Sequence, residues 1–141
     1  MNVQDVLNDK VAQELLASKE MASLAYTWRD GTPRAVPIWF QWTGTQVVMC
    51  SPVNAPKMKV LESRPEVAVS IYNNTWPYHA LYLRGTVKVE RFDGIAPELV
   101  GISEHYAGPD FANAWISQNR ASGLKWARIE LAPTYAALID C

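Results

Sequence analysis

Apolar and polar residues alternate along most of this chain, which is the pattern of strands that bury one face. The alternation is longest over residues 79–91, where Tyr82, Arg84 and Thr86 face away from an apolar set. Turn signals such as Asp30-Gly31 separate the alternating segments. Strands are therefore predicted over residues 22–28, 34–43, 46–51, 67–72, 79–91 and 124–131, with an extended continuation over 134–139.

Helical spacing of apolar residues interrupts this pattern in three places. An amphipathic helix is predicted over residues 3–16, packed over one end of the sheet. A shorter helix over 55–63 ends before Arg64-Pro65, and residues 95–119 predict two helices separated by Gly108-Pro109-Asp110. Six or so strands with few helices predict a mainly β fold, a barrel or sandwich with helical additions.

The chain of 141 residues shows no internal repeat and no linker, so a single domain over 1–141 is predicted. Two strand positions are unusual. Pro37 inside a strand indicates a sheet edge or a bulge, because it has no N–H to donate. Gly85 in the middle of the longest strand indicates a bulge or a close approach of another backbone segment.

The start of the helix over 55–63 is predicted to bind an anion. Asn54 is a candidate N-cap and Pro56 suits the first turn, where free N–H groups would lie beside Lys57 and Lys59. Lysine near a helix N-terminus is disfavoured by about 0.3–1 kcal/mol, so two lysines there favour a bound phosphate over a solvated helix face.

The amino-acid composition limits the classes of partner and compartment that this chain is expected to have. The net charge of -1, from 13 basic and 14 acidic residues, gives no basic field for nucleic acid. No apolar run reaches the ~20 residues of a membrane span, and the polar start is no signal peptide. Cys50 is expected to be a buried strand residue and Cys141 a chain-end thiol, so a cytoplasmic, reducing compartment is predicted. The sequence contains six Trp and six Tyr residues. Some of them are expected to form a ring-binding surface or an oligomer interface rather than part of the core.

Established catalytic motifs are missing from the sequence. It has no GxGxxG, P-loop, HExxH or GxSxG segment, and His79 and His105 stand alone without metal-ligand spacing. No metal site and no catalytic acid or base is therefore predicted. If the chain is an enzyme, its chemistry is expected to come from a cofactor.

Over nearly its whole length the chain resembles the FMN-binding split-barrel family, the pyridoxamine 5'-phosphate oxidase-like proteins. Val36-Pro37-Ile38-Trp39 is similar to the family's V-x-P-x-W stretch, and the segment 57–61 to its K-x-R-N-L. In the second motif Lys59 replaces the arginine, which gives a point charge in place of a bidentate fork. Segments 76–79 and 83–85 are similar to the family's fifth strand.

The resemblance implies a six-stranded split β-barrel and a homodimer with two cofactor sites at its interface. The cofactor site it implies comprises Lys57, Met58 and Lys59 at the phosphate, Val36, Pro37, Ile38, Trp39, Cys50 and Ser51 around the ring, and Trp76 and Tyr78 from the second subunit.

The function implied is an FMN-dependent oxidoreductase that transfers a hydride to or from a small substrate. The alternatives are a deazaflavin-dependent reductase, a non-enzymatic flavin- or haem-binding module, and a dimer whose site has lost its function. True pyridoxamine phosphate oxidases carry an arginine-rich C-terminal motif that this sequence lacks, so oxidation of that vitamin is not expected.

Overall fold

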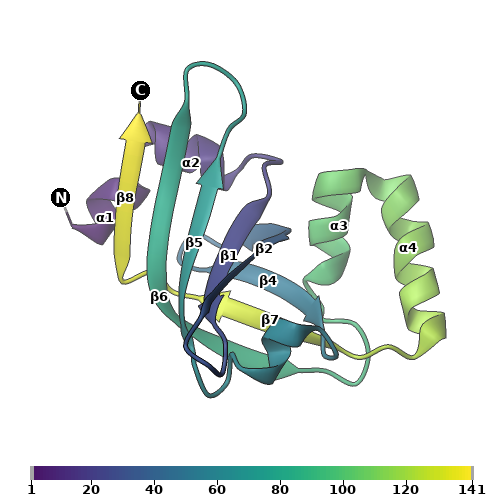
Figure 1. The fold of residues 1–141 in the computed structure, drawn as a ribbon. Coiled ribbons are helices and arrows are strands. Elements are labelled where there is room, and N and C mark those ends of the chain that lie inside the picture. The colour runs from purple at the N-terminus through teal and green to yellow at the C-terminus, as the bar shows by residue number, and fades with distance from the viewer. Residues whose placement is uncertain (1, 141) are drawn as a thin grey trace.

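The computed structural model describes residues 2–140, so the Cys141 thiol lies outside the described residues. Within this range the chain forms eight strands, four α-helices and one short 3₁₀ helix (Figure 1). In chain order these are α1 (Val3–Leu7), α2 (Lys10–Leu16), β1 (Ala22–Thr27), β2 (Pro33–Ile38), β3 (Phe40–Trp42), β4 (Val47–Pro52), η1 (Pro56–Lys59), β5 (Glu66–Tyr72), β6 (His79–Arg91), α3 (Leu99–Ala107), α4 (Pro109–Ser122), β7 (Trp126–Leu131) and β8 (Tyr135–Asp140).

The strands form one curled antiparallel sheet in the order β2-β1-β5-β6-β7-β4-β3, with β8 paired to β6. The long strand β6 joins two halves of this sheet. Its first part pairs with β5 and β8, and its last part pairs with β7. In Figure 1 the two halves run in clearly different directions. This architecture confirms a mainly β split barrel with helical additions.

The strand count differs from the six or so that the sequence pattern predicts. The segment 34–43 is not continuous, because pairing with β1 ends at Ile38 and pairing with β4 begins at Phe40. Trp39 lies at the break, where the chain passes from one half of the sheet to the other. The extended segment after Pro133 is a full strand, β8. Pro37 lies on β2, an edge strand, as its missing N–H predicts.

Gly85 lies in the middle of β6, between the part that pairs with β8 and the part that pairs with β7. Val87 pairs with Leu131 and Arg84 with Tyr135, so two residues of β6 face three residues of the β7–β8 connection. A Cβ on Gly85 would lie 2.8 Å from Leu131 Cδ1 and 2.9 Å from the Ala132 carbonyl oxygen. Of the two alternatives predicted for Gly85, the close approach of another backbone segment is confirmed. β6 itself is not bulged, because it pairs residue for residue with β5 across Gly85, and the extra residue lies in the β7–β8 connection.

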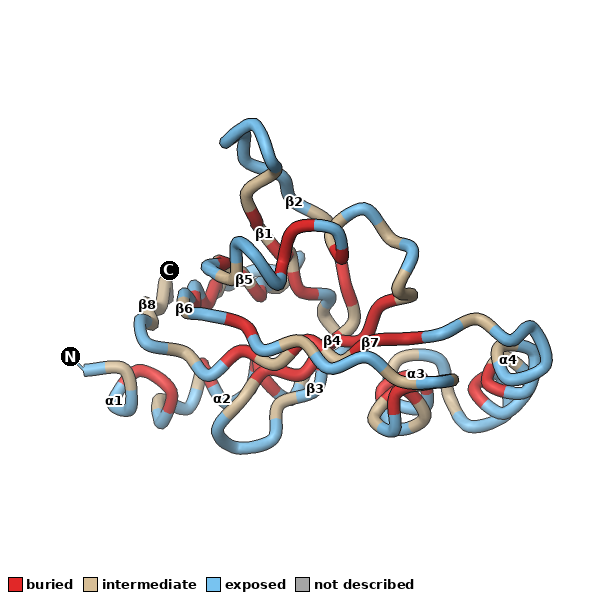
Figure 2. Tube along the Cα trace, turned by 90° about the horizontal axis from the view of Figure 1, so that it is seen from below, coloured by how far each residue is buried: buried red, intermediate tan, exposed pale blue. Residues whose placement is uncertain are grey.

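The core lies on the concave side of the sheet. Alternate strand residues such as Leu24, Val69, Leu81 and Ile129 are almost fully buried there, and α1 and α2 pack against β5, β6 and β8. Figure 2 shows that β1, β4 and β7 each contain buried segments. A second apolar cluster lies under α3 and α4. None of the helices formed by residues 2–140 has the length and apolar character needed to cross a bilayer.

Two helix predictions are wrong in detail. Residues 3–16 form two helices, because Asp9 caps the second one by accepting a hydrogen bond from the Val11 N–H at 2.8 Å. Residues 55–63 form only the four-residue 3₁₀ helix η1, whose cap position is Ala55 rather than Asn54. Pro97 precedes α3, and Gly108 separates α3 from α4.

Candidate functional site

A pocket of about 280 Å³ lies between the sheet and the helical pair α3–α4. It is lined by Met21, Pro37, Ile38, Trp39, Cys50, Pro52, Lys57, Leu99, Ile102, Trp115 and Trp126. Strands far apart in sequence build it, because β4 pairs with β7 and places Pro52 opposite Trp126. Paired residues of antiparallel strands point to the same face, so Cys50, Pro52 and Trp126 form a common wall.

Aromatic contacts fix the side of the pocket that α3 and α4 provide. The Trp39 ring stacks on Tyr106 with centroids 5.0 Å apart and planes 5° apart, and Trp115 meets it edge-on at 6.0 Å. Trp115 also contacts Trp126 edge-on at 5.8 Å. Trp39 is thus held at the strand break by rings from both helices. Offset and edge-on pairs of this kind stabilise by about 0.5–1.5 kcal/mol beyond the area that they bury.

The Tyr106 hydroxyl ties α3 to the sheet. It donates to the Glu20 carbonyl oxygen at 2.9 Å and accepts from the Phe40 N–H at 3.3 Å. We expect Tyr106→Phe to lower the free energy of unfolding by about 1–2 kcal/mol, because two partly buried backbone groups lose their partner. Urea unfolding measures this loss. Tyr72→Phe is the control, since that side chain is exposed, and equal losses in both variants would contradict the role given to Tyr106.

Among the lining residues that the structure describes, Lys57 is the only one with a cationic side chain. It is half-buried, and no carboxylate within residues 2–140 forms an ion pair with it. Burial lowers the pKa of the Lys57 ammonium below its usual range, and no neighbouring charge offsets this. An anion bound beside Lys57 would supply a counter-charge, which no carboxylate of residues 2–140 supplies.

The helix-dipole argument for this anion site is wrong. The 3₁₀ helix η1 has four residues, too few for a useful macrodipole. The amides of Met58 and Val60 already donate to the carbonyl oxygens of Ala55 and Lys57. The partly desolvated Lys57 ammonium, rather than a helix dipole, is therefore the feature of this turn that could attract an anion.

The structure brings together five of the eleven residues that the sequence assigned to a cofactor: Pro37, Ile38, Trp39, Cys50 and Lys57. The others lie elsewhere. Val36 and Met58 pack against the main core, and Lys59 is exposed. The buried Ser51 hydroxyl donates to the Pro52 carbonyl oxygen at 3.0 Å.

Trp76 and Tyr78 lie on the β5–β6 connection and line a separate hollow of about 490 Å³. The Trp76 side chain is 83% exposed. Neither residue lines the pocket that contains Lys57. Their assignment to a neighbouring subunit stays a prediction.

Six lining residues were missed from the sequence: Met21, Pro52, Leu99, Ile102, Trp115 and Trp126. The abundance of tryptophan was the one available signal, and it gave no positions. Leu99 and Ile102 have helical spacing that is typical of ordinary core packing, and Trp115 lies on the next helix. Only the docking of α3 and α4 on the sheet places them at the pocket.

Cys50 is buried in β4 as predicted. Burial, with a smaller contribution from Glu98, raises the pKa of its thiol to about 12, although Arg128 acts in the opposite direction. The protonated thiol is a weak nucleophile. In a Cys141→Ser background we expect no native-state reaction with a disulfide reagent at pH 8, and full reaction in denaturant. Rapid native labelling would show that the thiol is accessible and ionised.

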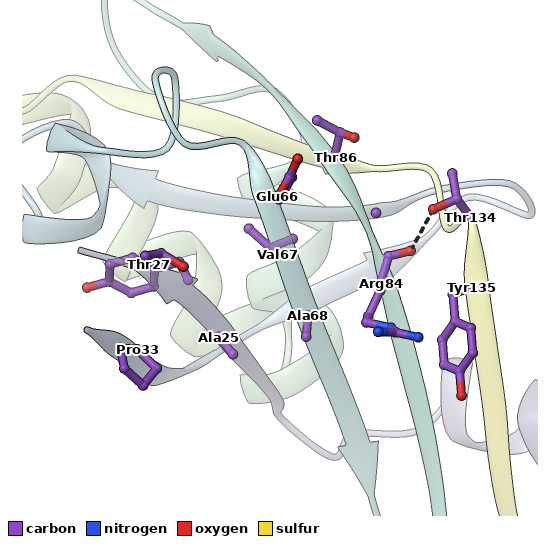
Figure 3. Close-up of a pocket in the computed structure, with 12 residues that line it drawn as sticks. Ala25, Thr27, Pro33, Glu66, Val67, Ala68, Arg84, Thr86, Thr134 and Tyr135 are labelled. Atoms are coloured by element: carbon purple, nitrogen blue, oxygen red, sulfur yellow. Dashed lines mark hydrogen bonds between the residues drawn. The ribbon is translucent and has the colours of Figure 1, made fainter. Parts of the chain in front are cut away.

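A larger hollow of about 540 Å³ lies on the convex side of the sheet, over β1, β5, β6 and β8. Figure 3 shows Ala25 and Ala68 along it and Arg84 beside the Tyr135 ring. The Arg84 guanidinium carbon is 3.9 Å from the centroid of that ring. This open hollow lacks the desolvated cation and the tryptophan wall of the smaller pocket, which is the better candidate for a small-molecule site.

No family model and no curated protein matches this sequence. Solved structures do match. An F420 reductase is 25% identical, with a TM-score of 0.70 over 89% of this chain and 94% of its own. A general stress protein 26-related protein of the pyridoxinephosphate oxidase family from Clostridium acetobutylicum is 12% identical, with a TM-score of 0.66 over 92% and 85%. The FAD and haem binding protein from Mycobacterium smegmatis is 22% identical, with a TM-score of 0.66 over 90% and 68%.

Proposed function

The structural neighbours of this chain are pyridoxamine 5'-phosphate oxidase-like split-barrel proteins, and from this premise we propose that it is an oxidoreductase using a phosphorylated flavin-type cofactor. One observation carries the proposal. Lys57, a half-buried ammonium without a carboxylate partner among residues 2–140, stands beside a pocket walled by three tryptophans. Such a pocket suits a flat ring with an attached phosphate.

The residues present fit such a group. The pocket of about 280 Å³ is just below the usual range of about 300–1,000 Å³ for small-molecule sites, so it would hold one planar ring system and leave the rest of the cofactor outside. Lys57 would bind the phosphate, with exposed Lys59 adding charge on the same turn. Pro37, Ile38 and Trp39 would border the ring and exclude water. When bound, the cofactor would supply hydride transfer, and the protein would supply position and electrostatics.

FMN and a deazaflavin are both candidates, and one set of residues favours the deazaflavin. Arg29 and Arg34 each hold a guanidinium carbon 5.3 Å from the Trp28 ring centroid, and Arg64 donates to the Arg29 carbonyl oxygen at 3.1 Å. None of these arginines forms an ion pair with a carboxylate of residues 2–140. This arginine cluster would serve a cofactor with a longer anionic tail, which agrees with the similarity to an F420 reductase.

We propose a homodimer through the convex face of β1, β5, β6 and β8. Small residues, Ser23, Ala25, Ala68 and Ser70, leave this face hollow, and the exposed rings of Tyr82 and Tyr135 border it. Figure 3 shows Ala25, Ala68 and the Tyr135 ring on this face. An exposed aromatic surface with room for close approach is typical of an interface. Trp76 and Tyr78 of a second copy would then complete the cofactor site.

Sedimentation tests the dimer. We expect Ala68→Glu to give monomers and to weaken cofactor binding, whereas Gln118→Glu on exposed α4 leaves the assembly unchanged. A monomeric native protein at micromolar concentration would contradict the proposed dimer.

The proposed function is tested by an absorption spectrum of the purified protein, followed by mass analysis of what it releases on denaturation. Competitive titration with FMN, F420 and haemin then ranks the cofactors. We expect FMN or F420 to bind and to be reduced or oxidised with an added electron donor and acceptor. Binding without turnover would support a carrier or sensor, and a preference for haemin would agree with the haem-binding neighbour. A colourless protein that binds none of the three would overturn the proposal.

A further inference from the structure

The convex face of β1, β5, β6 and β8 carries one positive and one negative side chain. Paired residues of antiparallel strands point to one face of a sheet, so the strand register fixes which side chains turn outward. This outward set comprises Ser23, Ala25 and Thr27 on β1, Glu66, Ala68 and Ser70 on β5, Tyr82, Arg84 and Thr86 on β6, and Tyr135 and Ala137 on β8. Of these described residues, only Glu66 and Arg84 are charged. The remaining members are small or aromatic.

Glu66 and Arg84 do not pair with each other, although they lie on neighbouring strands. Thr86 is opposite Glu66 and Ala68 is opposite Arg84, so the two charged residues are diagonal neighbours, within reach of long side chains. The Arg84 guanidinium instead turns toward β8, where its carbon lies 3.9 Å from the centroid of the Tyr135 ring (Figure 3). Neither charged side chain forms an ion pair with another residue of 2–140. Both exposed charges are therefore available to a partner.

The contact with Tyr135 holds Arg84 in place without using the edge of its guanidinium. The five N–H donors of an arginine lie in the plane of the group, whereas an aromatic ring contacts its face. Tyr135 is itself fixed opposite Arg84 by the pairing of β6 with β8. An arginine held in this way is suited to bind a carboxylate through two parallel hydrogen bonds, and it loses less side-chain entropy when it does so.

We infer that Arg84 of one copy binds Glu66 of the partner subunit, and that this reciprocal pair sets the register of the two copies. The inference rests on the homodimer of the proposed function. In a two-fold interface each contact occurs twice, so one arginine and one glutamate per chain form two ion pairs. The face has no net charge and is its own electrostatic complement, which suits a second copy better than a nucleic acid or a strongly charged protein. The hollow of about 540 Å³ that both residues line leaves room for the partner's side chains.

Charge reversal tests the pair, because it gives a result that a general loss of stability does not. Arg84→Glu places two carboxylates at each contact, and Glu66→Arg places two guanidinium groups there. We expect either variant alone to be largely monomeric, with the dimer dissociation constant raised roughly 100-fold or more, because like charges then face each other. An equimolar mixture of the two variants should form heterodimers, since every contact again joins a glutamate to an arginine. The double variant Arg84→Glu/Glu66→Arg should also form dimers.

Sedimentation velocity measures the assembly, and native mass spectrometry distinguishes heterodimers from homodimers by mass. Lys10→Glu and Glu14→Arg are the matched controls. They make the same charge changes on α2, where the two side chains are exposed and form an ion pair of 3.9 Å, and α2 packs on the concave side of the sheet. Both controls should remain dimeric. Circular dichroism checks that each variant is folded, and the double variant decides the result if a single variant does not fold alone.

Single variants that stay dimeric would overturn the pairing. So would monomeric variants that do not associate on mixing, or a double variant that does not dimerise. In each of these cases a dimeric native protein would preserve the proposed assembly, and only the Arg84–Glu66 contact would fail. A monomeric native protein would overturn both. Titration with FMN and F420 is a separate measurement, because a dimer that pairs as inferred but binds neither cofactor would overturn the proposed function alone.

Discussion

Replacing Lys57 with alanine is expected to weaken FMN binding by about 1–3 kcal/mol, or roughly 5- to 150-fold. The reason is the loss of a charge-assisted contact in a partly desolvated position, where such contacts are stronger than in water. Quenching of flavin fluorescence during titration measures the dissociation constant. F420 should show the same dependence on Lys57, because it also carries a phosphate.

The contact can be isolated by comparing FMN with riboflavin, which lacks the phosphate. We expect Lys57→Ala to affect FMN strongly and riboflavin little. Lys88→Ala is the control, since this exposed lysine on β6 lies outside the pocket lining. Equal effects on both ligands would place the phosphate elsewhere.

We also predict the stability of the Lys57→Ala protein in the absence of cofactor. Because burial lowers the pKa of Lys57 in the folded state, the unfolded chain binds its proton more tightly. The charged lysine therefore opposes folding at neutral pH, and this opposition fades as the pH rises from its lowered folded pKa toward its ordinary value. Lys57→Ala should not be less stable than the original protein at pH 7, and a large loss of stability would show that the ammonium has a structural partner.

Gly85→Ala is expected to destabilise the fold by about 1–3 kcal/mol, which is typical of overpacking in a filled site. A new methyl group would lie 2.9 Å from the Ala132 carbonyl oxygen, and a backbone atom cannot move aside as a side chain can. The β7–β8 connection would have to shift, and with it the junction of the two sheet halves. Urea or thermal unfolding measures the change.

Gly101→Ala is the matched control. Gly101 lies inside α3, and a Cβ there would have no atom within 4 Å beyond its own helix and chain neighbours. Alanine in a helix interior is favoured over glycine by roughly 0.5–1 kcal/mol, so this variant should be more stable. A Gly85→Ala protein as stable as the original would mean that the crossing segment is not held close to β6.

Local patterns explain why much of the fold could be predicted. The period-2 alternation of residues 79–91 gives β6 at its observed ends, and the glycine within it indicated the close approach of another backbone segment. The helix signals were less reliable. Asp9 restarts a helix inside residues 3–16, and Pro56 begins a turn too short to become an α-helix. Capping and short-turn geometry depend on one or two hydrogen bonds, which a pattern of apolar residues does not record.

The sequence by itself determined the strands, the mainly β class and the basic turn with Lys57, because each depends on neighbours along the chain. Only the tertiary structure decided which side chains share a pocket. Trp39, Trp115 and Trp126 come from a strand break, a helix and another strand, and they meet because β4 pairs with β7 and α3–α4 docks beside them. Burial also follows from this packing. The desolvated charge of Lys57, on which the proposed function depends, therefore could not be predicted from the order of the residues.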